Sequence, residues 1–331
     1  MGKVLITGGA GFIGGFLAKA LAAQGDTVHL VDNLARGRHD RFLSELLEMP
    51  HVALFERDLL QPEALGDLHT DYTQVLHCAA IIGVQHVLRH PYQTLRDNVQ
   101  LLDTAVTFAR RQPRLRRFVF ASTSEVYAGS LELGMLPIPT PEDTPLAVAA
   151  LDQPRTSYML SKICGEAMVR QAGLPFTIVR PHNFYGPRMG MSHVIPQLLD
   201  RAHRAAPGGI LEVFSVDHRR TFCFIDDAVE MIVHAAQAPS CEDQVLNVGS
   251  QSPELTIGEL AEVIVRVVGK DLKIVPRPAT PGSPMRRCPD MSRMAALTGA
   301  RARISVEEGV RRTYDWYRPM VFEGGEREVA T

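Results

Sequence analysis

Residues 7–14 read TGGAGFIG, and this glycine-rich stretch decides the fold. It follows an apolar run at 3–7 that is typical of a strand, and it opens a periodic apolar run at 12–24 that is typical of a helix. The glycine spacing GxxGxxG permits a tight turn, close approach of the backbone to a pyrophosphate, and close packing of helix on strand. The N–H groups at the start of the helix would bind the anion. This unit predicts a dinucleotide site that includes Gly8, Gly11, Phe12, Ile13 and Gly14.

Strand-like and helix-like runs alternate through the first half of the chain. We expect strands at 27–31, 51–55, 74–77, 117–121 and 176–180, and helices at 91–111 and 158–171. Such alternation predicts right-handed βαβ units. The expected fold class is therefore α/β, with a Rossmann-type doubly wound parallel sheet that carries helices on both faces.

In the second half, prolines and glycines interrupt this pattern, which predicts a smaller C-terminal substrate-binding domain. We expect residues 1–181 plus about 222–250 to form the NAD-binding Rossmann domain. Residues 182–221 plus 251–320 would form the smaller domain. The polar end of the chain, 321–331, is expected to be a loose tail.

Composition excludes several classes of function. The chain has 331 residues, 45% of them hydrophobic, and 35 basic against 37 acidic side chains give a net charge of -2. This balance gives no electrostatic reason to expect nucleic acid or a membrane surface as a partner. No apolar run approaches the about 20 residues of a membrane-spanning helix, and the N-terminus lacks a signal-peptide layout. Five cysteines without CxxC spacing favour free thiols in a reducing cytosol, so we expect a cytoplasmic protein without a metal site.

An acidic residue ends the second expected strand: Asp32 stands 24 residues after Gly8. A carboxylate there can accept hydrogen bonds from both adenosine-ribose hydroxyls and would repel a 2′-phosphate, so NAD is favoured over NADP. Arg36 and Arg38 lie close by and weaken this preference. Asp58, after the third strand, is expected either to contact the adenine amino group or to cap a turn. This part of the predicted cofactor site also includes Asn33 and Leu59.

Tyr158 and Lys162 are four residues apart on an expected helix, so they share one face. A phenol is normally neutral at pH 7, with a pKa of about 10. A fixed ammonium and a positively charged nicotinamide would lower that pKa and make a usable base for a sugar hydroxyl. The YxxxK spacing alone often arises by chance. Its support here is Ser122, Thr123 and Ser124, small hydroxyls at the carboxyl end of a central strand, where nucleotide-fold enzymes do their chemistry.

The glycine loop and Asp32 are followed along the chain by HCAA at 77–80, Asn98, STSEVY at 122–127, YMLSK at 158–162 and RPHNFYGPR at 180–188. From residue 4 to about 315, the chain resembles the extended short-chain dehydrogenase/reductases that act as nucleotide-sugar epimerases, dehydratases and decarboxylases. The resemblance implies that Tyr158 is the base at the sugar C4 hydroxyl. It also implies that Lys162 binds the nicotinamide ribose and that Thr123 hydrogen-bonds O4.

Further contacts are implied by the same resemblance. The expected substrate is a nucleotide-diphosphate sugar, and the expected assembly is a homodimer. The cofactor would also be contacted by His77, Ala79, Ala80, Asn98 and Ser122. The implied substrate residues are Ile82, Gly83, Asn183, Arg188, His193, Val194, Arg219, Arg220, Arg286 and Arg287.

Oxidation at C4 acidifies the C5–H bond and allows three outcomes: 4-epimerisation, loss of a C5 carboxyl as CO₂, or 5,6-elimination. Ser124 stands where dehydratases of the dTDP-glucose type carry an Asp, which disfavours that type. GDP-mannose 4,6-dehydratases share the Thr-Ser-Glu triplet, so a 4,6-dehydratase stays an alternative. Ser124 and Glu125 also resemble UDP-glucuronate decarboxylases, as do PRTSY at 154–158, GPRMGM at 186–191 and RRCPD at 286–290.

In those decarboxylases an arginine of the last motif faces the substrate carboxylate, so Arg286 or Arg287 would form a bidentate clamp. The equal alternative is that one of them grips a phosphate. We favour decarboxylation of a UDP-uronic acid slightly over epimerisation. An epimerase stays close behind because IIGVQH at 81–86 matches no subgroup; Glu125 would then be a C5 or C3 base or a supporting carboxylate. A dinucleotide-sensing regulator and a reductase that consumes NAD(P)H are the remaining alternatives.

Overall fold

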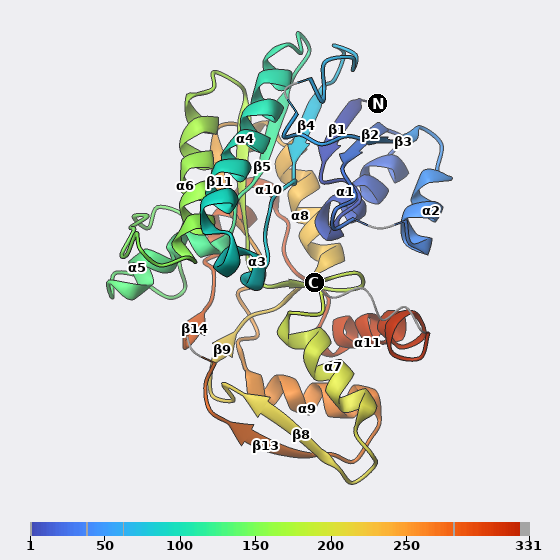
Figure 1. Ribbon diagram of the computed structural model, residues 1–331, viewed down its shortest axis with the longest axis vertical. Helices are drawn as coiled ribbons and strands as arrows, with labels where there is room; N and C mark the ends of the chain where they lie inside the picture. Colours follow the sequence, from blue (N-terminus) through green and yellow to red (C-terminus); the bar gives the residue numbers. More distant parts are fainter. Residues whose placement is uncertain (1, 38, 62, 281, 325–331) are drawn as a thin grey trace.

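The structure is a computed structural model that describes residues 2–37, 39–61, 63–280 and 282–324. Its centre is a seven-stranded parallel sheet (Figure 1). In spatial order the strands are β11 (Gln244–Val248), β6 (Phe176–Pro181), β5 (Arg117–Ala121), β4 (Gln74–His77), β1 (Lys3–Thr7), β2 (Thr27–Asp32) and β3 (Val52–Glu56). The predicted α/β fold with a doubly wound parallel sheet is confirmed.

The strand order reverses at the middle of the sheet, between β1 and β4. The chain runs outward from β1 to β3 on one side and outward from β4 to β11 on the other. Such a reversal leaves a crevice at the carboxyl ends of the strands, where open α/β sheets bind their ligands. The register pairs Thr7 with both His77 and Val31, so these three strand ends lie level at the crevice.

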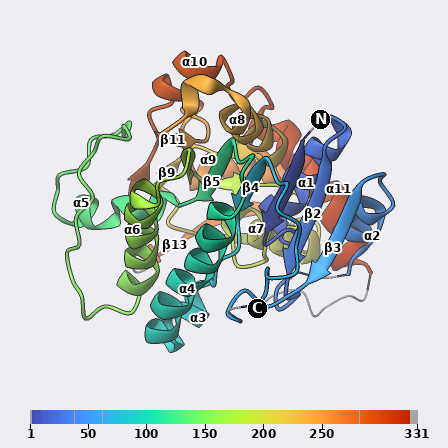
Figure 2. The same ribbon diagram turned by 90° about the horizontal axis from the view of Figure 1, so that it is seen from above.

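Four long helices cover the two faces of the sheet: α1 (Phe12–Ala23), α4 (Pro91–Arg110), α6 (Thr156–Gln171) and α8 (Ile225–Gln237). Successive side chains of β1 enter different cores, as the two-residue repeat of a strand requires. Val4 and Ile6 pack in the core that contains α1 and α8. Leu5 packs in the other core, with side chains of α4 and α6. Figure 2 shows α4 and α6 together on one face and α8 on the other.

A second group of elements lies beyond the carboxyl edge of the sheet, in the lower half of Figure 1. Its helices are α7 (Val194–Arg204), α9 (Ile257–Val268) and α11 (Val306–Tyr317). Its strands are β8 (Ile210–Phe214), β9 (Arg219–Arg220), β12 (Leu255–Thr256), β13 (Lys273–Arg277) and β14 (Arg286–Arg287). They form a β13-β8 pair and a three-stranded sheet in the order β12-β9-β14. Strand β14 therefore lies beside β9, although α8, β11, α9 and β13 separate them along the chain.

Shorter elements connect these parts: α2 (Arg41–Leu47), α3 (Val84–Arg89), η1 (Ser124–Tyr127), α5 (Ala128–Glu132), β7 (Phe184–Tyr185), β10 (Cys223–Phe224), η2 (Pro239–Cys241), α10 (Ser292–Thr298) and η3 (Arg318–Phe322). The helical turn η3 differs from the expected loose tail. The Phe322 ring lies 5.2 Å from the ring of His203 and 5.7 Å from that of Tyr317. The rest of the expected tail, 325–331, lies outside the described residues, as does Arg38. No helix of the described ranges has the length and apolar character needed to cross a bilayer.

A buried ion pair joins α6 to β6. Arg180 donates from Nε and Nη2 to the two carboxylate oxygens of Glu166, at 2.8 and 2.7 Å, and their side chains are 3% and 4% exposed. Ser122 donates to the same carboxylate at 2.7 Å. Arg180 also donates to the Tyr127 hydroxyl at 2.6 Å and to the Glu142 carbonyl at 2.9 Å. Because charges this deep are stable only when paired and hydrogen-bonded, these contacts act as one unit.

The first prediction concerns this pair. Arg180→Ala should lower the free energy of unfolding by about 3–5 kcal/mol, because it leaves the Glu166 carboxylate buried without its partner. Urea denaturation followed by circular dichroism measures the change. Arg41→Ala is the control: Arg41 is 79% exposed and, within the described ranges, pairs only with Glu45, so its loss should change stability by no more than about 0.5 kcal/mol. Equal stabilities for the two variants would contradict the role of the pair.

Candidate functional site

The glycine loop has the geometry that a dinucleotide requires. A Cβ at Gly14 would lie 2.2 Å from the Gly8 carbonyl oxygen, and a Cβ at Gly8, whose φ is +69°, would lie 2.7 Å from the Ala79 amide nitrogen. Neither position therefore accepts a side chain. Gly11 precedes α1 without a capping side chain, so the N–H groups of the first turn, at Phe12 and Ile13, point toward the crevice end of the helix. This cradle fits a pyrophosphate.

Asp32 lies at the adenosine side of the loop. Its carboxylate accepts hydrogen bonds from the backbone of Ala10 at 3.1 Å and of Leu34 at 2.9 Å. Burial raises its pKa, and these two N–H donors partly offset the effect. Each carboxylate oxygen keeps a further lone pair, so ribose hydroxyls can still donate to it. Asn33 and Asp58 each accept a hydrogen bond from the backbone N–H two residues later. For Asp58 this contact corresponds to the turn-capping alternative. Its neighbour Leu59 is buried.

Arg188, which was assigned to the substrate, contacts the glycine loop instead. Its guanidinium donates to the Ala10 carbonyl at 3.1 Å and to the Asp40 carboxylate at 2.6 Å, and it lies 4.6 Å above the Phe42 ring. Its side chain is 6% exposed. Arg188 therefore connects the glycine loop to Asp40 and does not line the expected sugar site.

Tyr158 and Lys162 lie at the strand end that carries Thr123. Burial raises the pKa of Tyr158 above its ordinary value, and the nearby Thr123 hydroxyl partly offsets the effect. Lys162 donates to the Ala121 carbonyl at 2.8 Å and lies 4.9 Å above the Phe120 ring. Burial lowers the pKa of Lys162 to about 8. The structure thus places Thr123, Tyr158 and Lys162 at the carboxyl end of β5, with Tyr158 near Thr123 and Lys162 on the Ala121 carbonyl.

The remaining cofactor residues hold the loop that follows β4. His77 shares a 2.8 Å hydrogen bond with Thr7, and burial lowers its pKa to about 3, so the imidazole is neutral. Asn98 accepts from the Ile81 amide at 2.7 Å and donates to the Ile81 carbonyl at 3.0 Å, which ties this loop to α4. Ala79 and Ala80 lie between these anchors, and Ser122 is turned toward Glu166.

At the sugar end, Arg287 donates to the Glu125 carboxylate at 2.8 Å. Arg287 holds the pKa of Glu125 below its ordinary value against the opposing effect of burial, and Arg155 and Arg220 act in the same direction. Glu125 directly follows Ser124, which is buried in η1. Arg286 points elsewhere, since its guanidinium makes a bidentate pair with Glu254. Of the two candidate arginines, only Arg287 reaches the site.

Arg220 lies opposite Arg287 in the pairing of β9 with β14. It donates to the Ser283 hydroxyl at 3.2 Å and to the Pro284 carbonyl, within the segment that leads into β14. Burial, followed by repulsion from Arg287, lowers the pKa of Arg220 to about 10. Arg219 is exposed on the same short strand and uses its backbone N–H to bind the Met285 carbonyl at 2.8 Å.

The other expected substrate residues border the crevice from two sides. Asn183 has a φ of +45° and donates to the Thr221 carbonyl at 3.0 Å, so its amide holds the backbone in place. His193 is the residue before α7, and Val194 begins that helix. Opposite them, Ile82 is 37% exposed, and Gly83 has a φ of +114°, a conformation that favours glycine.

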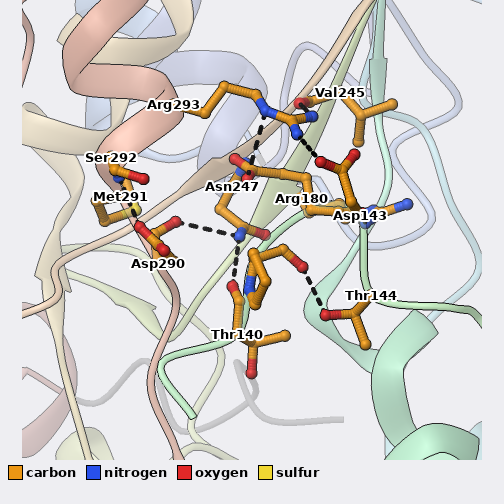
Figure 3. Close-up of polar contacts among 12 residues, drawn as sticks. Thr140, Asp143, Thr144, Arg180, Val245, Asn247, Asp290, Met291, Ser292 and Arg293 are labelled. Atoms are coloured by element: carbon orange, nitrogen blue, oxygen red, sulfur yellow. Dashed lines mark hydrogen bonds and ion pairs between the residues drawn. The ribbon is translucent and has the colours of Figure 1, made fainter. Parts of the chain in front are cut away.

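Sequence analysis missed a polar network behind the site. Asn247 on β11 donates to the carbonyls of Thr140 at 2.9 Å and Asp290 at 3.2 Å (Figure 3). It also accepts from the Tyr127 hydroxyl at 3.0 Å. Arg293 joins Asp143 to the same region. The segment before α6 and the segment after Arg287 are therefore fixed to one strand.

Among the described residues, no group of three or more His, Cys, Asp or Glu side chains is placed to hold a metal ion. The ionisable groups of the crevice are instead engaged with one another or with the backbone. The chemistry that this arrangement can support is proton transfer beside a dinucleotide.

Comparison with known proteins agrees with this geometry. UDP-N-acetyl-alpha-D-glucosaminuronate decarboxylase of Bacillus cytotoxicus is 31% identical over 335 residues, which cover 96% of this chain and 98% of that protein. UDP-glucuronic acid decarboxylase 2 of Arabidopsis thaliana is 29% identical over 333 residues, which cover 98% of this chain and 70% of that protein. The structure of the UDP-glucose 4-epimerase of Thermus thermophilus in complex with NAD superposes with a TM-score of 0.78 at 26% identity, covering 96% of this chain and 100% of that one.

The match to a family extends over most of the chain, from residue 4 to residue 249, and includes the glycine loop, Asp32, Tyr158 and Lys162. The cradle at the glycine loop fits the dinucleotide that the family takes its name from. The chain therefore belongs to the NAD dependent epimerase/dehydratase family, and NAD is its cofactor.

Proposed function

We propose that this enzyme converts a nucleotide-diphosphate sugar through a 4-keto intermediate, and that its reaction is the decarboxylation of a UDP-uronic acid. The observation that carries the proposal is the Arg287–Glu125 ion pair, which lies beside Thr123 and Ser124 at the sugar end of the crevice. A guanidinium there suits a substrate carboxylate, because it can bind both carboxylate oxygens at once. The decarboxylases among the similar proteins support the same reaction.

The first step removes a proton and a hydride from C4 of the sugar. NAD held at the glycine loop, Asp32 and Lys162 would supply the hydride acceptor for this oxidation and the hydride for the final reduction. Tyr158 accepts the proton of the C4 hydroxyl as general base, and Thr123 orients that oxygen. Lys162 gives one of its three N–H donors to the Ala121 carbonyl, which leaves two for a ribose hydroxyl and keeps a positive charge near the phenolate.

The second step breaks the C5–C6 bond. Its electron pair passes into the C4 ketone, which becomes an enolate, and C6 leaves as CO₂; C5 then takes up a proton and C4 is reduced again. Arg287 would orient the leaving carboxylate by exchanging its contact with Glu125 for the substrate. Arg220 keeps β14 beside β9 and thereby holds Arg287 at the required place.

A 4-epimerase is the second candidate. The same contacts of Tyr158, Thr123 and Lys162 would serve it, and similarity to the Thermus thermophilus epimerase supports it. In that case the sugar keeps its substituent at C5, and the Arg287–Glu125 pair stays closed during the reaction. The two candidates differ in the mass of the product, which makes them separable.

With UDP-glucuronate as the probe, we expect release of CO₂ and formation of a UDP-pentose without net consumption of NAD, because the hydride is returned. Mass spectrometry of the nucleotide products measures the outcome. Tyr158→Phe should lower turnover by about 10²–10⁴-fold and leave the bound NAD in place, because only the proton acceptor is lost. Full turnover by Tyr158→Phe would refute the assigned base. A C4 epimer that retains its carboxylate would replace the decarboxylase with the epimerase.

Arg287→Ala serves as the matched test of the carboxylate clamp within the same experiment. If Arg287 binds the C6 carboxylate, this variant should bind UDP as well as the parent enzyme and lose affinity only for UDP-glucuronate. Calorimetric titration with both ligands separates the two contributions. An equal loss of affinity for UDP would mean that Arg287 grips a phosphate and would remove the main support for decarboxylation.

The pH dependence follows from Lys162. Its positive charge is lost as the pH rises through its pKa of about 8, so kcat should fall on the alkaline side with a midpoint near that value. Lys162→Arg should be slower overall but should not show this fall, because a guanidinium stays charged throughout the range. Steady-state rates across neutral and alkaline pH give the comparison. An identical alkaline fall in both enzymes would assign it to another group.

We also propose a cytoplasmic homodimer, on the basis of the family resemblance and of the free cysteines. Two apolar side chains are exposed beside each other near the start of α4: Tyr92, on α4, is 70% exposed, and Leu151, before α6, is 78% exposed. They offer contact area for a second copy of the chain. Sedimentation equilibrium should give twice the protomer mass of 36.5 kDa. A monomer at micromolar concentration would contradict the assembly.

A further inference from the structure

Arg36 extends across the cofactor crevice. It belongs to the loop after β2 that begins with Asp32, yet its Nη1 donates to the Ile82 carbonyl, in the loop after β4, at 3.3 Å. Its positive charge also affects the pKa of two other side chains, Tyr158 and His193. Burial has the largest effect on both groups: it raises the pKa of Tyr158 and lowers that of His193. The charge of Arg36 lowers both pKa values.

The sheet order shows what this contact spans. Strand β1 lies between β4 and β2, so the loops after β4 and β2 flank the glycine loop that follows β1. A side chain that joins those two loops must therefore cross the glycine loop. Since a pyrophosphate binds at that loop, over the start of α1, the Arg36 guanidinium lies along the track between Asp32 and Tyr158 that the dinucleotide follows.

The charges around this crossing leave Arg36 available to an anion. Two carboxylates stand four residues from Arg36 along the chain, and one of them, Asp32, already accepts from the backbone of Ala10 and Leu34. The other arginine of the region, Arg188, is held behind the glycine loop by Asp40. In the described part of the chain Arg36 forms no ion pair, and its hydrogen bond goes to a neutral carbonyl.

We infer that Arg36 is a strap across the cofactor crevice, whose guanidinium binds the pyrophosphate of NAD and slows release of the cofactor. One end of the strap is the loop after β2, and the other is the Ile82 carbonyl. An enzyme that returns its hydride within each cycle has no need to release NAD between turnovers. A strap that slows release is compatible with such a cycle, whereas an enzyme that exchanges NAD for NADH at every turnover would be impeded by it.

The test is the rate at which bound NAD exchanges with the surrounding solution. Purified enzyme would be mixed with an excess of deuterium-labelled NAD and separated by rapid gel filtration at intervals, and its bound NAD would be analysed by mass spectrometry. Arg36→Gln should exchange about tenfold faster or more, because it loses a charge-assisted hydrogen bond to the pyrophosphate. Arg36→Lys should give an intermediate rate, because an ammonium keeps the charge but not the two-pronged contact.

Arg41→Gln is the matched control. Arg41 lies in the same stretch of chain and is exposed, and among the described residues it pairs only with Glu45, so its removal should leave the exchange rate unchanged. Equal far-ultraviolet circular dichroism spectra for the parent enzyme and the three variants would exclude a folding defect. An exchange rate for Arg36→Gln within twofold of the parent enzyme would overturn the inference. The inference would also be overturned if Arg36→Gln left the exchange rate of NAD unchanged but weakened the binding of UDP-glucuronate, because Arg36 would then contact the substrate. The measurement needs no turnover, so failure of the proposed decarboxylation leaves it valid.

Discussion

The Glu166–Arg180 ion pair is the contact on which the geometry of the site depends. Glu166 stands on the helix that carries Tyr158 and Lys162, and Arg180 stands on the neighbouring strand. Because both charges are buried, neither can shift without leaving the other unpaired in a medium of low polarity. The pair therefore fixes the depth and rotation of α6 against the sheet. Through Ser122 it also fixes the strand end from which Thr123 extends.

Charge is distributed unequally along the crevice. Where hydride and proton are transferred, burial favours neutral groups: it lowers the pKa of Lys162 and His77 and raises that of Tyr158. In such surroundings little water screens a charge, so the positive charge of Arg36 and the negative charge of Glu125 both reach the Tyr158 phenol, where they act in opposite directions on its pKa. At the end of the crevice where the sugar is expected, the Arg287 guanidinium holds the pKa of the Glu125 carboxyl below its ordinary value and so favours its charged form. A charged substituent on the sugar would enter between groups already suited to it.

Several residue roles followed from chain position alone, and others did not. The glycine loop, Asp32 and the Tyr158–Lys162 pair lie within local strand–loop–helix units, whose geometry is decided by neighbouring residues. Arg286 and Arg287 are adjacent in sequence and chemically identical, so no pattern distinguishes them. Their alternation along β14 sends one to Glu254 and the other to Glu125. Arg188 belongs to a recognisable motif, but its partner Asp40 is far away in the sequence and appears only in the folded chain.

The sequence by itself determined the parallel α/β sheet, the dinucleotide loop, the use of NAD and the family. These depend on periodicity and on short motifs, and such signals act over one turn or one strand. Tertiary structure decided which arginine reaches the sugar end, that Arg188 holds the loop, that Glu166 and Arg180 set the position of α6, and that Arg36 crosses the crevice. Each of these is a contact between segments brought together by the strand order. Such contacts depend on the direction of a side chain and on its burial, which a linear pattern does not contain.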